Sequence, residues 1–143
     1  MKYLILVLCF LSFDVKTDKN VETFFPCQSY YDQSLKRNVF TSVDEMPLCS
    51  GGMRKLSSFF YEVRLEENYN HSSWQHKVDL TFIIDEKGCI INAGIDKKKT
   101  EEYSKLDLEY IRAAKKMPKW KPAKCNGKVV PFKFSTTFRI TPQ

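Results

Sequence analysis

The cysteines and histidines are the side chains of this 143-residue chain that could bind a metal or act as nucleophiles. His71 and His76 are five residues apart with no cysteine nearby, and no two cysteines have metal-finger spacing. The GxSxG, HExxH, phosphate-loop and dinucleotide-binding motifs are absent. The sequence therefore predicts no metal, no cofactor and no catalytic residue, and we expect the protein not to be an enzyme.

Oxidation of the cysteines is the chemistry that remains. One of the five cysteines, Cys9, lies in an N-terminal apolar run, and the others are Cys27, Cys49, Cys89 and Cys125. In an exported chain an even number of cysteines favours disulfides, and free buried thiols are the alternative. Loops of moderate length would result from pairing Cys27 with Cys49 and Cys89 with Cys125, which is the first hypothesis among the connectivities.

The N-terminal residues 1–13 read as a targeting segment. Their apolar run, Tyr3 to Phe13, would rise only about 16 Å as a helix, roughly half of the hydrocarbon core. This predicts a secretory signal and a place in the periplasm or cell envelope. Lipidation at Cys9 is disfavoured because Leu8 precedes it instead of a small residue. We expect a polar, loosely structured lead-in over 14–37 and one folded domain over 38–143.

The charge of the chain is basic. Its 23 Lys and Arg residues against 17 Asp and Glu give a net charge of +6, which favours anionic partners. The candidate basic patch comprises Lys97, Lys98, Lys99, Lys119, Lys121 and Lys124; an ordinary solvated surface is the alternative. The export signal and the absence of a recognised motif disfavour nucleic acid.

The residue patterns predict two helices and three strands. Apolar residues at helical spacing predict a helix in 50–65. Alternation of apolar and polar residues predicts a strand over 77–85, followed by a hairpin turn at Gly88. The returning strand, 89–95, needs a bulge near Ile91 and Asn92 to keep its apolar residues on one face. A capping box at Ser104 and Asp107 begins the second helix.

The end of the chain reads as a helix stop followed by a strand. Pro118 ends the second helix, Trp120 is expected to cover the open end of the core, and Asn126-Gly127 turns the chain into an alternating strand over 130–140. The order α-β-β-α-β predicts an α+β fold, a two-layer sandwich of a three-stranded mixed sheet with two helices on one face. The first strand should be central and the last strand at an edge.

Three segments resemble the TonB C-terminal domain family, particularly its Bacteroidetes-type members. They are "VFTSVDEMPLCSGGM", "VDLTFIIDEKGCI" and "LDLEYIRAAKKMPKWKPAKCNGKVVPFKFSTTFRI". The stretch "ENYNHSSWQHKV" departs from the family, because it lacks the usual Pro and Gly before the first strand of the sheet. The long anchor and Pro-rich segment of full-length TonB are also missing, so we do not expect this chain to transduce energy unaided.

The resemblance implies a non-catalytic envelope domain that binds the extended TonB box of an outer-membrane receptor by strand addition. The implied partner is such a receptor or another envelope protein, and a second copy of the chain could pair in the same way. The expected pairing residues are Val129, Val130, Phe132, Lys133, Phe134 and Thr136. If the Thr136 amide faces outward, Thr136→Pro should abolish binding. The alternative is electrostatic binding to an anionic envelope polymer such as peptidoglycan.

Overall fold

The computed structural model describes residues 26–66 and 76–140. The apolar segment 1–13 with Cys9, and the stretch 67–75 with His71, lie outside the described residues. Within the described ranges, no helix is both long enough and apolar enough to cross a membrane.

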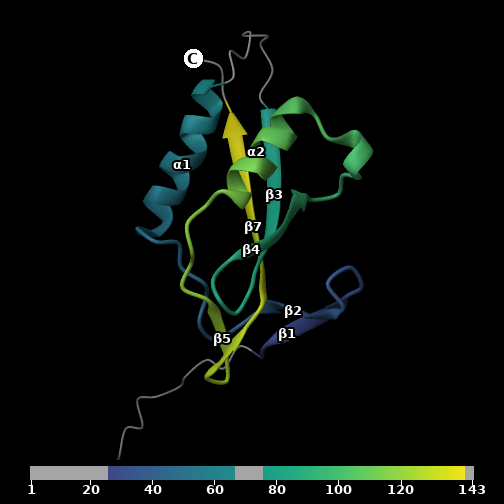
Figure 1. Ribbon diagram of the computed structural model, residues 1–143, viewed down its shortest axis with the longest axis vertical. Coiled ribbons are helices and arrows are strands. Elements are labelled where there is room, and N and C mark those ends of the chain that lie inside the picture. Colours follow the sequence, from purple (N-terminus) through teal and green to yellow (C-terminus); the bar gives the residue numbers. More distant parts are fainter. Residues whose placement is uncertain (1–25, 67–75, 141–143) are drawn as a thin grey trace, which may run out of the picture.

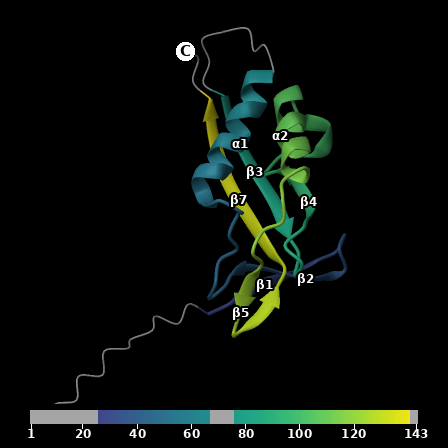
Figure 2. The same cartoon turned by 60° about the vertical axis from the view of Figure 1, so that its left-hand side comes forward.

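Two helices lie over part of one face of a five-stranded sheet (Figures 1 and 2). Along the sheet the strand order is β1-β2-β7-β3-β4, and β5 and β6 form a separate two-stranded sheet. The elements are β1 (Gln28–Asp32), β2 (Arg37–Ser42), α1 (Gly52–Glu66), β3 (His76–Ile84), β4 (Ile90–Ile95), the 3-10 helix η1 (Thr100–Glu102), α2 (Lys105–Lys115), β5 (Ala123–Cys125), β6 (Lys128–Val130) and β7 (Phe132–Ile140).

The predicted α+β class, with both helices on one face, is confirmed, and the sheet is larger than expected. The expected three strands are β4, β3 and β7, with β3 in the middle as predicted. The prediction that the last strand lies at an edge of the sheet is wrong, because β2 pairs with β7 at one position on its other side. The bulge in β4 is also confirmed, because Ile83 pairs with Asn92 and Ile84 pairs with Ile90, which leaves Ile91 without a partner. Ser104 caps α2 and forms the predicted capping box with Asp107.

Part of the segment expected to be a loose lead-in, residues 28–37, instead forms β1, a turn and the first residue of β2. The Asp32 carboxylate stabilises the turn of this β1–β2 hairpin by accepting hydrogen bonds from the backbone amides of Ser34 and Leu35, both at 3.0 Å. The hairpin joins the sheet where Phe40 pairs in parallel with Phe132. A sequence reading missed this hairpin because the side chains of β1 are polar or exposed and show no buried alternation.

The core lies between the helices and the inner face of β3, β4 and β7. Trp120 is only 3% exposed, and its ring packs against Phe82 at 5.5 Å and Phe134 at 5.2 Å between centroids. Its backbone amide donates to the Gly88 carbonyl at 2.9 Å. The predicted role of Trp120, covering the end of the core, is therefore confirmed.

The closing strand predicted over 130–140 is divided at Pro131. Before Pro131, β6 pairs with β5 through the predicted Asn126-Gly127 turn, where both residues have positive φ, 50° and 74°. After Pro131, β7 enters the five-stranded sheet. The division matters because it removes two of the expected pairing residues from the last strand.

Candidate functional site

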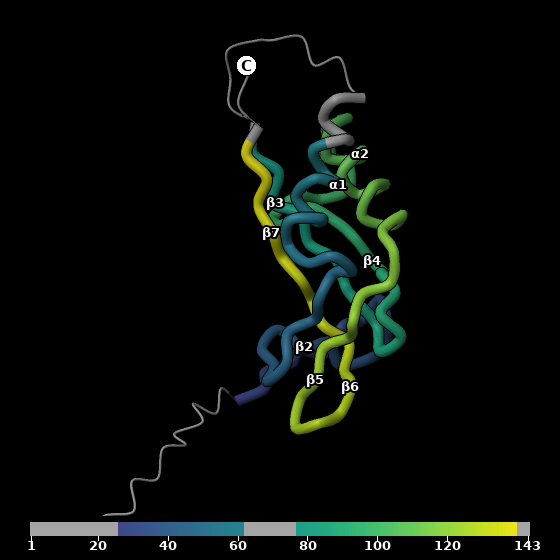
Figure 3. Tube along the Cα trace, turned by 90° about the vertical axis from the view of Figure 1, so that its left-hand side faces the viewer, coloured from purple at the N-terminus to yellow at the C-terminus, as the bar shows by residue number. Residues whose placement is uncertain are grey.

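The strand β7 has one fully paired side and one mostly open side. Nine residue pairs join it to β3, from His76 with Ile140 to Ile84 with Phe132. On its other side, a single pair, Phe40 with Phe132, joins it to β2. Figure 3 shows β7 running on past β2 toward the opposite end of the molecule. Within residues 26–66 and 76–140, no strand pairs with that side beyond Phe132.

The direction of each backbone group in β7 follows from one hydrogen bond. The Phe40 amide donates to the Pro131 carbonyl at 2.9 Å, so that carbonyl faces β2. Successive residues of a strand direct their N–H and C=O groups to alternate sides. Lys133, Ser135, Thr137 and Arg139 therefore face the β2 side, and Phe132, Phe134, Thr136 and Phe138 face β3.

A second hydrogen bond, on β3, gives the same assignment. The Asp96 amide donates to the Asp79 carbonyl at 2.8 Å, so Asp79 faces β4. By alternation its neighbour Leu80 faces β7, and Leu80 lies opposite Thr136. The amide of Thr136 thus points into the sheet, and the condition attached to the Thr136→Pro prediction is not met.

The structure shows where the pairing residues expected from the sequence lie. Val129 and Val130 belong to β6 and pair with Lys124 and Ala123. Phe132, Phe134 and Thr136 direct their backbone groups to β3, and Lys133 lies beside β2. The open backbone groups belong to residues that the sequence analysis did not name: Ser135, Thr137 and Arg139. The sequence could not identify them, because backbone groups alternate between the two sides of a strand. Which set points outward is known only once a neighbouring strand is placed.

The side chains of β7 give this edge two different faces. On the helix side, Phe134 stacks on Phe82 at 5.2 Å, and Phe138 packs against Phe60 at 4.5 Å. On the other face, Ser135, Thr137 and Arg139 are exposed. A strand added here would therefore continue both the apolar and the polar face of the sheet.

A short polar network lies on the exposed face of the sheet, beside the open edge of β7. The Thr137 hydroxyl donates to Asp79 Oδ1 at 2.6 Å, and Lys77 lies 2.8 Å from the other Asp79 oxygen. These bonds, the one to Lys77 foremost, lower the pKa of the Asp79 carboxyl. The carboxylate thus stays ionised at neutral pH, and it fixes the side chain of Thr137 over the sheet.

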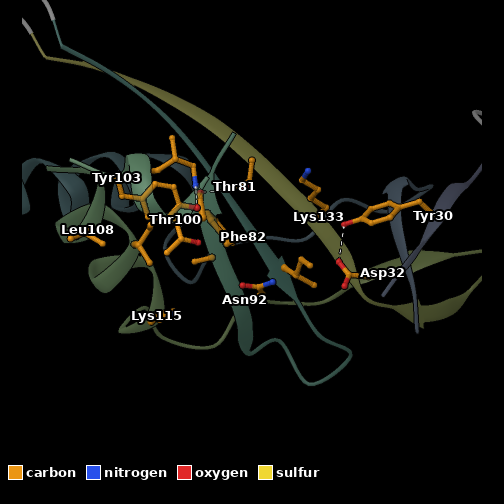
Figure 4. A pocket seen from close by; sticks show the side chains of 15 residues that line it. Tyr30, Asp32, Thr81, Phe82, Asn92, Thr100, Tyr103, Leu108, Lys115 and Lys133 are labelled. Carbon is orange, nitrogen blue, oxygen red and sulfur yellow. Dashed lines mark hydrogen bonds between the residues drawn. The ribbon is translucent and has the colours of Figure 1, made fainter. Parts of the chain in front are cut away.

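A pocket of about 530 Å³ lies along β4, away from the open edge of β7. Figure 4 shows Tyr30, Asp32 and Lys133 at one end of it and Thr100, Tyr103 and Leu108 at the other. The Tyr103 hydroxyl accepts a hydrogen bond from the Ile95 amide at 3.3 Å, and so pairs a backbone donor on the outer side of β4. The outer edge of β4 is therefore partly covered by a side chain, in contrast to the open edge of β7.

The six lysines of the candidate basic patch do not form one group. Lys97, Lys98 and Lys99 precede η1, and the other three follow α2. Lys98 binds the buried carboxylate of Asp107 at 2.6 Å. Lys121 and Lys124 both lie near Glu45, at 3.9 Å and 3.1 Å. These ion pairs partly neutralise the positive charge expected at this surface.

The cysteines pair differently from the expected connectivity. Cys27 is bonded to Cys125, with Cα atoms 6.1 Å apart. Cys49 and Cys89 are free thiols, so neither expected pair forms. Burial raises the pKa of the Cys49 thiol, only partly opposed by Lys55, and this keeps it protonated and unreactive.

Comparison with known families gives a match over the C-terminal half of the chain. The family model described as the Gram-negative bacterial TonB protein C-terminal matches residues 68–140. That range contains β3 to β7 and α2, and leaves the β1–β2 hairpin and α1 outside. No curated protein and no solved structure matches the chain significantly.

Proposed function

The chain belongs to the family of Gram-negative bacterial TonB protein C-terminal domains, and from that premise we propose that it binds an extended peptide at the open edge of β7. The family is non-enzymatic, acts in the cell envelope and is associated with TonB-dependent transport. The proposed partner is the TonB-box segment of an outer-membrane receptor.

One observation supports the proposal: the backbone groups of Ser135, Thr137 and Arg139 face away from β3. They also lie beyond the one residue pair that joins β7 to β2. An open strand edge is a liability unless it is covered or used. The features that discourage pairing, Pro131 and Lys133, both lie at the end of β7 that β2 already occupies. The rest of the edge suits strand addition, in which main-chain hydrogen bonds supply affinity.

The test replaces one outward amide and leaves the sheet intact. Ser135→Pro removes a backbone donor from the open side, where proline is tolerated because no internal ladder bond is lost. Ser135→Ala is the matched control, since it removes the hydroxyl and keeps the amide. Fluorescence anisotropy with a labelled TonB-box peptide should show binding to the parent and to Ser135→Ala. We expect Ser135→Pro to weaken binding at least tenfold.

Electrostatic attachment to an anionic polymer is the competing function, suggested by the net charge of +6. It predicts a different result, because changing Lys97, Lys98 and Lys99 to Gln would then weaken envelope binding more than Ser135→Pro. Binding to purified peptidoglycan that falls steeply with salt, together with no capture of TonB-dependent receptors from envelope extract, would favour the polymer and overturn strand addition.

A further inference from the structure

Three side chains of metal-ligand type meet where the N-terminal part of the chain reaches the β5–β6 hairpin. Cys27 precedes β1, Asp44 follows β2, and Cys125 ends β5. Their sulfur atoms and a carboxylate oxygen all lie within 4.8 Å of one another. The residues are far apart in sequence, with 98 positions separating the two cysteines, so no spacing motif could reveal the cluster.

The separation of the donors fits a tetrahedral metal ion. Cys27 Sγ lies 3.5 Å from Asp44 Oδ1. Zinc bonds of about 2.3 Å to sulfur and about 2.0 Å to oxygen, at tetrahedral angles, place the two donor atoms about 3.5 Å apart. Two thiolates on the same ion would be about 3.8 Å apart. With the cysteine Cα atoms 6.1 Å apart, rotation of the side chains can provide this separation once the disulfide is opened.

Asn126 orients two of the three donors. Its backbone amide donates to Asp44 Oδ2, which leaves Oδ1 directed toward Cys27. Its side-chain amide donates to Cys125 Sγ at 3.5 Å, a contact that would stabilise a thiolate. Such outer partners fix the ligands of metal sites. Asp44 is exposed and Cys27 half-buried, so water can reach the site and provide a fourth ligand.

We propose that Cys27, Cys125 and Asp44 form a redox-controlled site for one thiophilic divalent cation, of which Zn²⁺ fits the donor set best. A dithiol reductant supplies two electrons and two protons to the disulfide and becomes a disulfide itself. The cation then displaces the two thiol protons and binds two thiolates and one carboxylate. The disulfide form lacks both thiolates and does not bind the cation in this way.

The test uses Co²⁺ as a spectroscopic probe on the full chain, with Cys9→Ser in every sample to remove the cysteine of the N-terminal apolar run. Protein reduced with an immobilised phosphine and kept without oxygen should bind one equivalent of Co²⁺. We expect thiolate-to-cobalt charge transfer in the near ultraviolet and intense visible bands of tetrahedral cobalt. Added Zn²⁺ should displace the cobalt, and the oxidised protein should show neither signal.

Variants decide which residues are ligands. Cys27→Ser should abolish the charge-transfer band, and Asp44→Asn, which keeps an oxygen acceptor for the Asn126 amide, should weaken Co²⁺ binding at least tenfold. Cys49→Ser and Cys89→Ser are matched controls that should bind as the parent does. The proposal is overturned if the reduced chain binds no stoichiometric cobalt, if Cys27→Ser or Asp44→Asn binds normally, or if either control loses the bands.

Discussion

Thr136 lies directly opposite Leu80 in the antiparallel ladder of β3 and β7, so its amide points into the sheet and those of Ser135 and Thr137 point away. This relationship determines which residues of the last strand can bind another strand. It also separates two substitutions, one position apart, that should have opposite consequences for folding and for binding.

Thr136→Pro should destabilise the fold, whereas Ser135→Pro should not. Proline at Thr136 removes an internal ladder bond and leaves a carbonyl of β3 unsatisfied, which should cost about 2 kcal/mol or more of unfolding free energy. Proline at Ser135 should cost less than about 1 kcal/mol, as for exposed positions. Urea unfolding of both variants measures the difference, and equal losses would refute the assigned direction of these amides.

Gly88→Ala should be among the most damaging small substitutions. Gly88 has a φ of 79°, and an added Cβ would lie 1.9 Å from the Trp120 carbonyl oxygen. Strain and displacement of the Trp120 segment should together cost about 2–5 kcal/mol. Gly127→Ala is the matched control, because φ is 74° there and no atom lies within 4 Å; it should cost about 1–2 kcal/mol. Thermal unfolding that shows equal losses would mean that the contact with Trp120 is unimportant.

Asp107 should contribute to stability only above its folded-state pKa. Burial alone would raise the pKa of this carboxyl, but hydrogen bonds from Lys98 and from the Ser104 amide and hydroxyl prevail and lower it. A lowered folded-state pKa stabilises the fold above about pH 4, and this contribution is lost as the pH falls further. Asp107→Asn should therefore cost roughly 1–3 kcal/mol at neutral pH and show a smaller loss of stability on acidification. An unchanged acid profile would contradict this role.

Reduction of the Cys27–Cys125 disulfide should lower the unfolding free energy substantially. The bond closes a loop with a sequence separation of 98 residues, and the chain-entropy model gives about 4 to 5 kcal/mol for a loop of this length. Cys125→Ser should reproduce the loss, and Cys49→Ser should not. Non-reducing peptide mapping of the exported protein should find this pair alone, and a Cys27–Cys49 or Cys89–Cys125 bridge would contradict the structure.

The sequence was informative where local signals act alone. The capping box at Ser104, the turn at Gly88 and the bulge at Ile91 each follow from a few neighbouring residues, and the structure contains all three. The alternation predicted for the last strand is also present in the structure, where Phe134 and Phe138 both pack against the core. These features set the fold class before any long-range contact is known.

The features that remained hidden depend on contacts between distant segments. The β1–β2 hairpin is held by Asp32 and by its junction with β7 at Phe40, and its own residues have no apolar alternation. The Cys27–Cys125 pair depends on where that hairpin places the chain. The direction of the Ser135 amide depends on which strand lies on each side of β7. Composition and spacing contain none of this information.

Amide hydrogen exchange of β7, measured by NMR with and without a TonB-box peptide, tests strand addition at this edge most directly. In the free protein, the amides of Phe134, Thr136 and Phe138 should be protected by β3, and those of Ser135, Thr137 and Arg139 should exchange rapidly. Saturating peptide should protect the second set at least tenfold and leave the first set nearly unchanged. Rapid exchange of Ser135 and Thr137 in the peptide-bound protein would contradict strand addition at β7.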